Sequence, residues 1–590
     1  MTFVDHHSYT DFSQSRIQHI DFDFVVDFAQ KKLHSTAKYK LDKAQTGSLF
    51  LDSSDLEIKR VHSDGKDVEW ELDLDDAVLG QRLHLKSLKD TDSFTVEYST
   101  SPGARALQWT DPIQTAGKAH PFLYSQCQAI NARTLFPCQD SPSVRITYAA
   151  TVEVPKGLVA VMGAQPVETV EKDATSIYSF EMPQPIPSYL FAIAVGNLEF
   201  AEIGPRSGVY AEPELIEAAA WEYAGNEEML DAAEELLGPY LWDRYDLLIM
   251  PPSFPFGGME NPRLTFLSST AILGDRSYLS LINHELAHAW TGNLVTNASW
   301  DHFWLNEGWT TYADNRISEA IEGKEKAEML MATYTESAQQ EIDFFGEDNI
   351  LTQLRTDLKG LDPDASVSQI PYFKGAHFLT QLEKVVGREK FDEFIQKYMQ
   401  SFQFKSITTE EFLVFLEAEL PEAVEAVDVQ NWVYEPGTPK GGFDTPSEQY
   451  DDAMQVLERF LDGKRPSKDD VDGWNRFQKM AVLQGVLGKA SVEDCGYLGE
   501  LFDMQNSQDS SLLTLFYQSC IKAGQQEVMP LVEEYLGRIG RELHTREIYR
   551  ALSEQDWAKE ETRRIFDKVK AGYHPVSAGN IEAILSKAGI

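Results

Sequence analysis

The segment 281–290 places two histidines four residues apart inside an apolar helical repeat. Its apolar residues recur with the period of an α-helix, and Gly292 follows as a stop signal. The pattern therefore predicts a buried helix. On a helix, residues four apart lie on one face with their Cβ atoms about 5 to 6 Å apart. His284 and His288 can therefore bind one metal ion between them.

Two glutamates stand where a general base and a third metal ligand are needed. Glu285 projects to the side of the histidine pair, where its carboxylate can reach an attacking water without binding the metal. Glu307 opens a second predicted helix, which can return antiparallel to the first. Two imidazoles, one carboxylate and an open fourth position are the ligand set of a catalytic zinc. We therefore expect one Zn²⁺ per chain, bound by His284, His288 and Glu307.

The sequence around these residues resembles a known family. HELAHAWTGNLVTNASWDHFWLNEGW at 284–309, with GGMEN upstream at 257–261, is similar to the M1 family of zinc aminopeptidases, which are gluzincins. The segments 126–130, 189–192 and 251–255 resemble the leukotriene A4 hydrolase-like branch of that family. The resemblance extends over nearly the whole chain and implies the fold and activity of that branch.

Hydrophobic periodicity changes along the chain and indicates several domains. Residues 22–200 alternate between apolar and polar, which is typical of strands, and a helical period follows. A linker rich in glycine and proline at 435–442 precedes one helical segment after another. With the resemblance, this predicts a multidomain α+β fold. We expect an N-terminal β-sheet domain at 1–203, a thermolysin-like, mostly helical zinc catalytic domain at 204–442, and a C-terminal α-helical superhelix of armadillo or HEAT type at 443–590.

Charge and cysteine content limit the partners and the compartment. The chain has 52 basic and 94 acidic residues, a formal charge of -42, which opposes binding to nucleic acid or to an anionic membrane. Its 4 cysteines form no dense framework, and the N-terminus lacks the pattern of a signal peptide. No apolar run approaches the roughly 18 residues of a membrane span. We expect a cytoplasmic protein without an obligate protein partner.

Residues upstream of the histidines suggest a site for a peptide. Paired glycines, Gly257 and Gly258, let another backbone approach closely, so a peptide can add itself there as a strand. An ordinary glycine turn is the alternative. A carboxylate beside that edge, Glu260, can pair with the free α-ammonium of a peptide. Resemblance to the family gives Glu260 this role and adds Gln128, from a polar loop, at the substrate's amino end. Met259 is a candidate for contact with the first side chain.

Two further residues take their roles from the resemblance. Tyr372, between a proline and a predicted helix, matches the family tyrosine that stabilises the tetrahedral intermediate. A buried core tyrosine is the ordinary alternative. Arg541 matches the arginine by which this branch recognises a substrate carboxylate, and a surface arginine on a helix is the alternative. Leu543 occupies the position of a nearby lysine in the branch.

The sequence therefore predicts a zinc aminopeptidase that removes N-terminal residues from short peptides, with Glu285 as the general base. Epoxide hydrolysis of the leukotriene A4 hydrolase type is an alternative or a second activity. Asp364 matches the aspartate used for that reaction, whereas Val367 replaces a tyrosine that contacts the lipid. A non-catalytic zinc-containing binding protein is a third hypothesis. Structural zinc sites usually fill all four positions, often with cysteine, and no cysteine lies near this motif.

Overall fold

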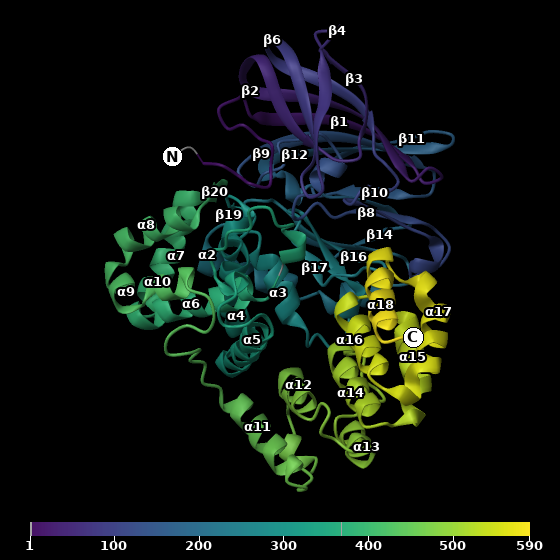
Figure 1. Cartoon of the computed structure of the whole chain (residues 1–590), viewed down its shortest axis with the longest axis vertical. Helices are drawn as coiled ribbons and strands as arrows, with labels where there is room; N and C mark the ends of the chain where they lie inside the picture. The colour runs from purple at the N-terminus through teal and green to yellow at the C-terminus, as the bar shows by residue number, and fades with distance from the viewer. Residues whose placement is uncertain (1–2, 367) are drawn as a thin grey trace.

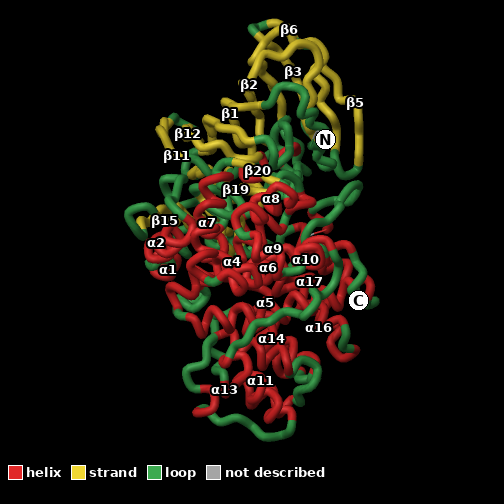
Figure 2. The backbone as a smooth tube through the Cα atoms, turned by 90° about the vertical axis from the view of Figure 1, so that its left-hand side faces the viewer, coloured by secondary structure: helices red, strands yellow, loops and turns green. Residues whose placement is uncertain are grey.

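The computed structural model describes residues 3–366 and 368–590. The strands of the N-terminal region lie at one end of the molecule, and helices make up most of the rest (Figure 1). Figure 2 shows the same separation from the side, with strands at the top and helices below. This arrangement confirms the predicted multidomain α+β fold, while the domain boundaries at 203/204 and 442/443 stay predictions. Within the described residues, no helix is long and apolar enough to cross a membrane.

The N-terminal domain contains two sheets. The larger has the strand order β11-β12-β9-β1-β2-β6-β3-β4, with β5 also paired to β6. Its strands are β1 (Ile17–Asp27), β2 (Lys32–Ser53), β3 (Glu57–Ser63), β4 (Lys66–Asp67), β5 (Trp70–Asp76), β6 (Gly80–Ser99), β9 (Arg145–Pro155), β11 (Gln165–Glu171) and β12 (Thr175–Pro187). The smaller sheet has the order β10-β13-β8-β7. It consists of β7 (Leu107–Thr110), β8 (Phe122–Ser125), β10 (Val159–Met162) and β13 (Ile193–Gly196).

Alternating burial explains why these segments form sheets. Every second residue of β9 is buried, so one face of the strand packs inward. Phe22 of β1 and Tyr148 of β9 meet edge to face with ring centroids 6.3 Å apart. The alternation read from the sequence thus produces the core of the domain. The end of β8 leads directly into the polar loop that carries Gln128.

A five-stranded sheet lies at the start of the catalytic domain, and its first strand, at 199–202, precedes the predicted boundary at 203/204. One edge of this sheet lies beside the metal-binding helix. Its order is β14-β15-β16-β18-β17, and the short edge strand β17 runs antiparallel to β18. These strands are β14 (Glu199–Glu202), β15 (Ser207–Ala211), β16 (Tyr245–Met250), β17 (Gly258–Met259) and β18 (Leu264–Ser268). A small parallel pair, β19 (Val295–Asn297) and β20 (Lys405–Ile407), follows further along the chain. Because β17 is an edge strand, its free side is available to a peptide.

Helices make up the remainder of this domain. They are α1 (Ile216–Glu222), α2 (Asn226–Leu237), α3 (Leu279–Ala287), α4 (Trp304–Glu322), α5 (Lys324–Phe345), α6 (Ile370–Val386), α7 (Arg388–Phe402), α8 (Thr409–Glu419), α9 (Pro421–Ala426) and α10 (Val429–Tyr434). α4 packs against α3, α5 and α6 and is the central helix of the domain. This position brings residues from three neighbouring helices to the metal centre.

The metal-binding helix ends earlier than its glycine stop signal indicates. Regular α-helix stops at Ala287, so His288 occupies the C-cap position with φ -54° and ψ -26°. Gly292, with φ 133°, lies in the turns that follow. His288 keeps helical dihedral angles, and its side chain therefore stays on the same face as that of His284.

The C-terminal domain is entirely helical in its regular structure. Its helices are α11 (Glu448–Leu461), α12 (Arg476–Gly485), α13 (Val492–Leu501), α14 (Ser510–Lys522), α15 (Met529–Arg538), α16 (Glu542–Ser553), α17 (Lys559–Val569) and α18 (Pro575–Lys587). In Figure 1, α11 and α12 lie below the catalytic domain and α14 to α18 lie to its right. The backbone N–H of Glu542 donates to Pro255 O at 3.0 Å. This bond holds the start of α16 against the segment that leads into β17.

Candidate active site

Three side chains from two packed helices converge at the predicted metal centre. α3 supplies His284 and, at its C-cap, His288, whereas Glu307 lies in the first turn of α4. The two Nε2 atoms lie 3.2 Å apart, and Glu307 Oε2 lies 3.3 Å from that of His284 and 3.5 Å from that of His288. Glu307 Oε2 is buried and has no hydrogen-bond partner among the described residues. A buried, unpartnered carboxylate oxygen facing two imidazole nitrogens fits the ligand set of Zn²⁺.

Hydrogen bonds on the outer side of both rings aim their Nε2 atoms at this centre. His284 Nδ1 lies 2.9 Å from Asp314 Oδ2. His288 Nδ1 lies 3.2 Å from Thr291 O and 3.1 Å from Thr310 Oγ1. A carboxylate and a carbonyl oxygen only accept, so Nδ1 carries the proton in each ring and Nε2 presents its lone pair. Both histidines are therefore prepared to bind a metal through Nε2.

Burial and neighbouring charges set the protonation of the two glutamates. Burial opposes ionisation of Glu307, but His288 and His284 outweigh it and lower its pKa to about 2. Burial dominates at Glu285 and raises its pKa to about 7. Glu307 is therefore ionised, as a metal ligand must be, whereas Glu285 can gain and lose a proton near neutral pH.

The edge strand β17 lies directly against Glu285. A Cβ atom added to Gly258 would overlap the Glu285 carboxylate, so only glycine allows this approach. Gly258 pairs with Leu267 of β18 on one side, which leaves the other side of the edge strand for a ligand. A peptide added along that edge would have its backbone beside both the Glu285 carboxylate and the metal ligands.

A second carboxylate stands next to this edge. Glu260 is 4% exposed, and one of its carboxylate oxygens lies within 4.8 Å of a carboxylate oxygen of Glu285 and of a ring nitrogen of His288. Gln128 Nε2 donates to Glu260 Oε1 at 3.4 Å, so the loop from the N-terminal domain closes over this carboxylate. Burial raises the pKa of Glu260, and His288 opposes that rise. The pair offers one anion and one amide to a group with several N–H donors, such as an α-ammonium.

Tyr372 approaches the metal centre because α4 and α6 touch at two glycines. A Cβ atom on Gly308 would lie 2.8 Å from Gly375 Cα, so the two backbones are in contact. This contact places Tyr372, in the first turn of α6, with its ring 6.0 Å from the ring of His284. Burial, with Glu307 nearby, raises the pKa of Tyr372 well above its usual range. Its hydroxyl therefore stays protonated and can donate a hydrogen bond.

The C-terminal domain contributes one predicted residue to the surroundings of the β17 edge. Arg541 is 8% exposed, and its Nη2 would lie 2.7 Å from a Cβ atom on Gly257. Leu543, the residue in place of a lysine, is 51% exposed. Met259 is buried, and the side-chain amide of Gln126 contacts its Sδ at 3.1 Å. The structure thus brings all predicted site residues to one region, although they come from three domains.

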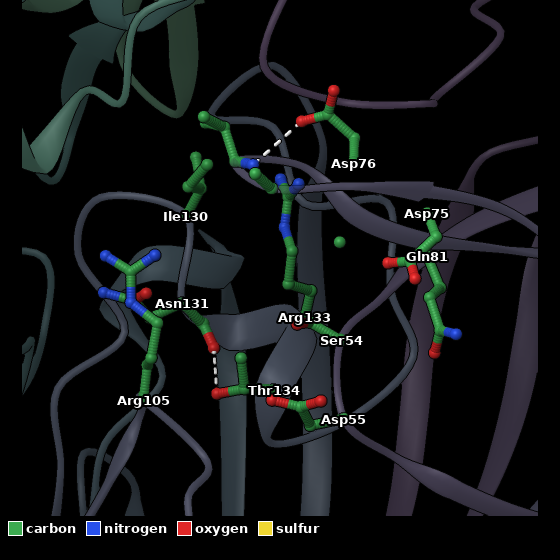
Figure 3. A pocket seen from close by; sticks show the side chains of 13 residues that line it. Ser54, Asp55, Asp75, Asp76, Gln81, Arg105, Ile130, Asn131, Arg133 and Thr134 are labelled. Atoms are coloured by element: carbon green, nitrogen blue, oxygen red, sulfur yellow. Dashed lines mark hydrogen bonds between the residues drawn. The ribbon is translucent and has the colours of Figure 1, made fainter.

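The carboxylate of Asp364 accepts hydrogen bonds from the loop that carries Gln128. Its Oδ1 accepts from the Ala129 N–H at 2.9 Å, and its Oδ2 accepts from Asn131 Nδ2 at 3.0 Å and from Arg105 Nη2 at 2.9 Å. Figure 3 shows Arg105 and Asn131 in the lining of an adjacent polar cavity of about 320 Å³. No predicted site residue of the described chain lines that cavity. Val367, the other residue of the epoxide hypothesis, lies outside the described residues.

Sequence reasoning missed the groups that support the metal ligands. Asp314 follows Glu307 by about two helical turns, so the helical period of α4 was the available signal. Thr310 had only the same periodicity. Arg105 and Asn131 had no local signal, because the N-terminal domain brings them to Asp364 only in the folded chain.

Models of known domains match most of the chain in order. The peptidase M1 N-terminal domain matches residues 16–190, the peptidase family M1 domain matches 221–432, and the leukotriene A4 hydrolase C-terminal domain matches 474–585. The first region contains all strands of the two N-terminal sheets except β13, and the second contains the metal ligands. The third contains α12 to α17 and most of α18. The order and content of the domains agree with the predicted family.

Whole proteins show the same relationship. Leucine aminopeptidase 2 of Aspergillus niger is 37% identical over 96% of this chain and 95% of its own length. Leukotriene A-4 hydrolase of Xenopus laevis is 38% identical over 97% of this chain and 98% of its own length. The yeast LTA4 hydrolase structure in complex with bestatin matches with a TM-score of 0.92 and 31% identity, covering 99% of this chain and 97% of that one. With these matches along its whole length and the zinc ligand set at its centre, the chain belongs to the M1 family of zinc metallopeptidases, in the leukotriene A4 hydrolase-like branch.

Proposed function

We propose that this protein is a zinc aminopeptidase that releases N-terminal residues from short peptides. The observation that carries the proposal is the buried carboxylate of Glu260, which the Gln128 amide contacts at the end of the β17 edge. An endopeptidase has no use for an anion there, whereas a free α-ammonium both neutralises it and supplies hydrogen bonds. The leucine aminopeptidase 2 relatives support the same reading.

His284, His288 and Glu307 would hold one Zn²⁺ per chain. When bound, the ion supplies a Lewis acid that polarises the scissile carbonyl and lowers the pKa of a water. Glu285, beside the β17 edge, takes a proton from the attacking water and passes it to the leaving amine. Its pKa of about 7 before metal binding suits a group that must both accept and donate.

Tyr372 and the peptide-binding groups complete the reaction. The protonated hydroxyl of Tyr372 donates to the oxygen that becomes negative when water attacks the carbonyl. Glu260 and Gln128 hold the substrate's amino end, and the backbones of Gly257 and Gly258 pair with the peptide. Because the anchor for the amino end is fixed, the first peptide bond reaches the metal centre and one residue leaves at a time.

Met259 and Arg541 are proposed to contact the rest of a short substrate. Met259, on the edge strand, directly precedes Glu260 and is the candidate for contact with the first side chain of the peptide. Arg541, beside Gly257, is placed for the carboxylate at the other end of a short peptide. An enzyme that binds both ends of its substrate favours short peptides over long chains.

Epoxide hydrolysis is the second candidate, because leukotriene A-4 hydrolase of Xenopus laevis matches 97% of the chain. In this chain, however, both oxygens of Asp364 already accept hydrogen bonds from Ala129, Asn131 and Arg105. A carboxylate engaged in this way is poorly placed to direct a water at a lipid. The binding-protein hypothesis is the weakest, because Glu285, Glu260 and Tyr372 all surround the metal ligands.

The cysteines support a reducing compartment such as the cytoplasm. All four, each within the described residues, are buried and free of disulfides. Burial raises the pKa of Cys127 and Cys138 well above the usual range of a thiol, so they remain protonated and inert. We therefore propose cytoplasmic peptides with a free N-terminus as substrates.

A matched pair of substrates tests the proposal. A tripeptide with a free amino group and its N-acetylated twin are incubated with the protein, with and without a zinc chelator. We expect cleavage of the free peptide alone, lost on chelation and restored by added zinc. Equal cleavage of both peptides would exclude Glu260 as an anchor for the amino end. Cleavage of neither by the zinc-loaded protein would contradict the aminopeptidase proposal.

A further inference from the structure

Asp314 carries a buried carboxylate whose hydrogen-bond partners include the metal-binding residue His284. It lies on α4 with 0% of its surface exposed. In the part of the chain that the structure describes, its carboxylate contacts no lysine or arginine and bonds only His284 and Tyr334. A buried carboxylate without a cationic partner destabilises a fold, because ionised groups lose strong hydration. Asp314 therefore depends on positive charge delivered through His284.

We propose that Asp314 and Tyr334 are positioning residues that set the affinity of this protein for zinc through His284. The inference rests on the proposed zinc site and adds two residues that do not touch the metal. Asp314 Oδ2 lies 2.9 Å from His284 Nδ1. The hydroxyl of Tyr334 donates to Asp314 from 3.3 Å at Oδ1 and 3.4 Å at Oδ2.

The two ligand histidines are supported unequally. His288 Nδ1 faces a backbone carbonyl and a threonine hydroxyl, which are neutral. His284 Nδ1 faces a carboxylate, which holds the proton on Nδ1 more strongly and makes Nε2 the better electron donor. Loss of the Asp314 charge therefore weakens one specific ligand and leaves the support of His288 intact.

Tyr334 fixes the orientation of Asp314 and links it to the substrate side of the site. It lies on α5, and its ring stacks on Phe373 with centroids 4.6 Å apart and planes at 16°. Phe373 directly follows Tyr372, the proposed donor to the oxyanion. The stacking holds the tyrosine hydroxyl where it can restrain both oxygens of Asp314. α4, α5 and α6 thus meet at this hydrogen-bonded chain.

Three variants of the full chain test the proposal. Asp314→Asn keeps the shape but removes the charge, and Tyr334→Phe removes only the hydroxyl. Ser318→Ala is the matched control, because Ser318 lies one turn after Asp314 on α4 and accepts from Asn283 Nδ2 at 2.9 Å. It removes a buried hydrogen bond between α3 and α4 without touching the ring of His284.

The main measurement is zinc affinity, obtained by competition with a chromophoric chelator in the absence of substrate. We expect Asp314→Asn to bind zinc about 10- to 100-fold more weakly, as for other partners of metal-bound histidines. Tyr334→Phe should weaken binding by roughly two- to fivefold, since it leaves the charge in place. Ser318→Ala should bind zinc like the wild type.

Thermal melting separates this role from a structural one. The rise in melting temperature that zinc causes grows with the logarithm of its affinity, so the gap between zinc-loaded and zinc-free protein should shrink for Asp314→Asn and persist for Ser318→Ala. Wild-type zinc affinity in Asp314→Asn would overturn the proposal, as would an equal loss of affinity in Ser318→Ala. An inactive protein that still shows the expected affinities would contradict the proposed function and leave this inference standing.

Discussion

The metal centre and the proposed peptide-binding site are built in different ways. The proposed metal ligands and general base come from α3 and α4, which are neighbours in sequence and packed together. The proposed peptide-binding site combines Gln128 from the N-terminal domain, Glu260 from the catalytic sheet edge and Arg541 from the helical domain. Helix geometry and one contact between two helices therefore assemble the proposed metal centre. The proposed selection of the substrate, in contrast, depends on residues that three domains bring together.

Replacement of Glu285 by glutamine should have the largest effect on activity, and this effect should arise at the metal centre alone. Removal of the general base should lower kcat/KM by roughly 10³-fold or more, with zinc still bound and KM little changed. Steady-state kinetics and metal analysis measure both quantities. Glu212→Gln is a control, because Glu212 is equally buried and bonds Ala116 N at 2.8 Å away from the metal. A Glu285→Gln variant with the wild-type rate would rule out the assigned base.

Replacement of Glu260 by alanine should weaken recognition of the substrate's amino end and leave the metal centre intact. Loss of a buried charge partner for the α-ammonium should lower kcat/KM for a free tripeptide by about 10²-fold. The N-acetylated twin, a poor substrate of both proteins, should change little. The discrimination ratio between the two peptides is therefore the quantity to measure. An unchanged ratio would show that the amino end is held elsewhere.

The pH dependence of kcat/KM should follow the ionisation of Glu285 at the metal centre rather than that of the peptide-binding residues. Glu285 must be deprotonated to act as a base, so activity should fall as pH decreases through its pKa, about tenfold for each pH unit. Its pKa is about 7 without a metal, and a nearby dication favours the ionised form and lowers this value. We expect the acidic limb below pH 7. A limb centred above pH 7 in the zinc-loaded enzyme would contradict this assignment.

Replacement of Arg541 by alanine should have the smallest effect on activity. The size of this effect should depend on whether the peptide ends in a free carboxylate. Loss of a partner for the substrate carboxylate should raise KM for a tripeptide by roughly five- to tenfold. The tripeptide amide, which lacks that carboxylate, should be cleaved equally by both proteins. Arg546→Ala is a matched control, since Arg546 lies on α16 and pairs with Glu547 at 3.3 Å. Equal losses with acid and amide would assign Arg541 a purely structural role.

Much of the fold and of the proposed metal centre was accessible from local patterns. Alternation predicted the strands of the N-terminal domain, and helical spacing placed His284 and His288 on one face. The exact end of α3 was not accessible, because helical angles continue through His288 although the regular bonding stops before Gly292. The partners of Asp364 were equally hidden, since Arg105 and Asn131 lie far from it in sequence.

The sequence by itself determined the residue types that can hold zinc and carry a proton. One helical period relates His284 and His288, and Glu307 stands at the start of the next predicted helix. It also determined the family, which the matches along the whole chain confirm. Only the tertiary structure decided which groups support these residues. Asp314 reaches His284 through the packing of α3 on α4, and Arg541 reaches Gly257 through the docking of the helical domain. Such contacts depend on the relative placement of whole elements, which no short pattern in the chain encodes.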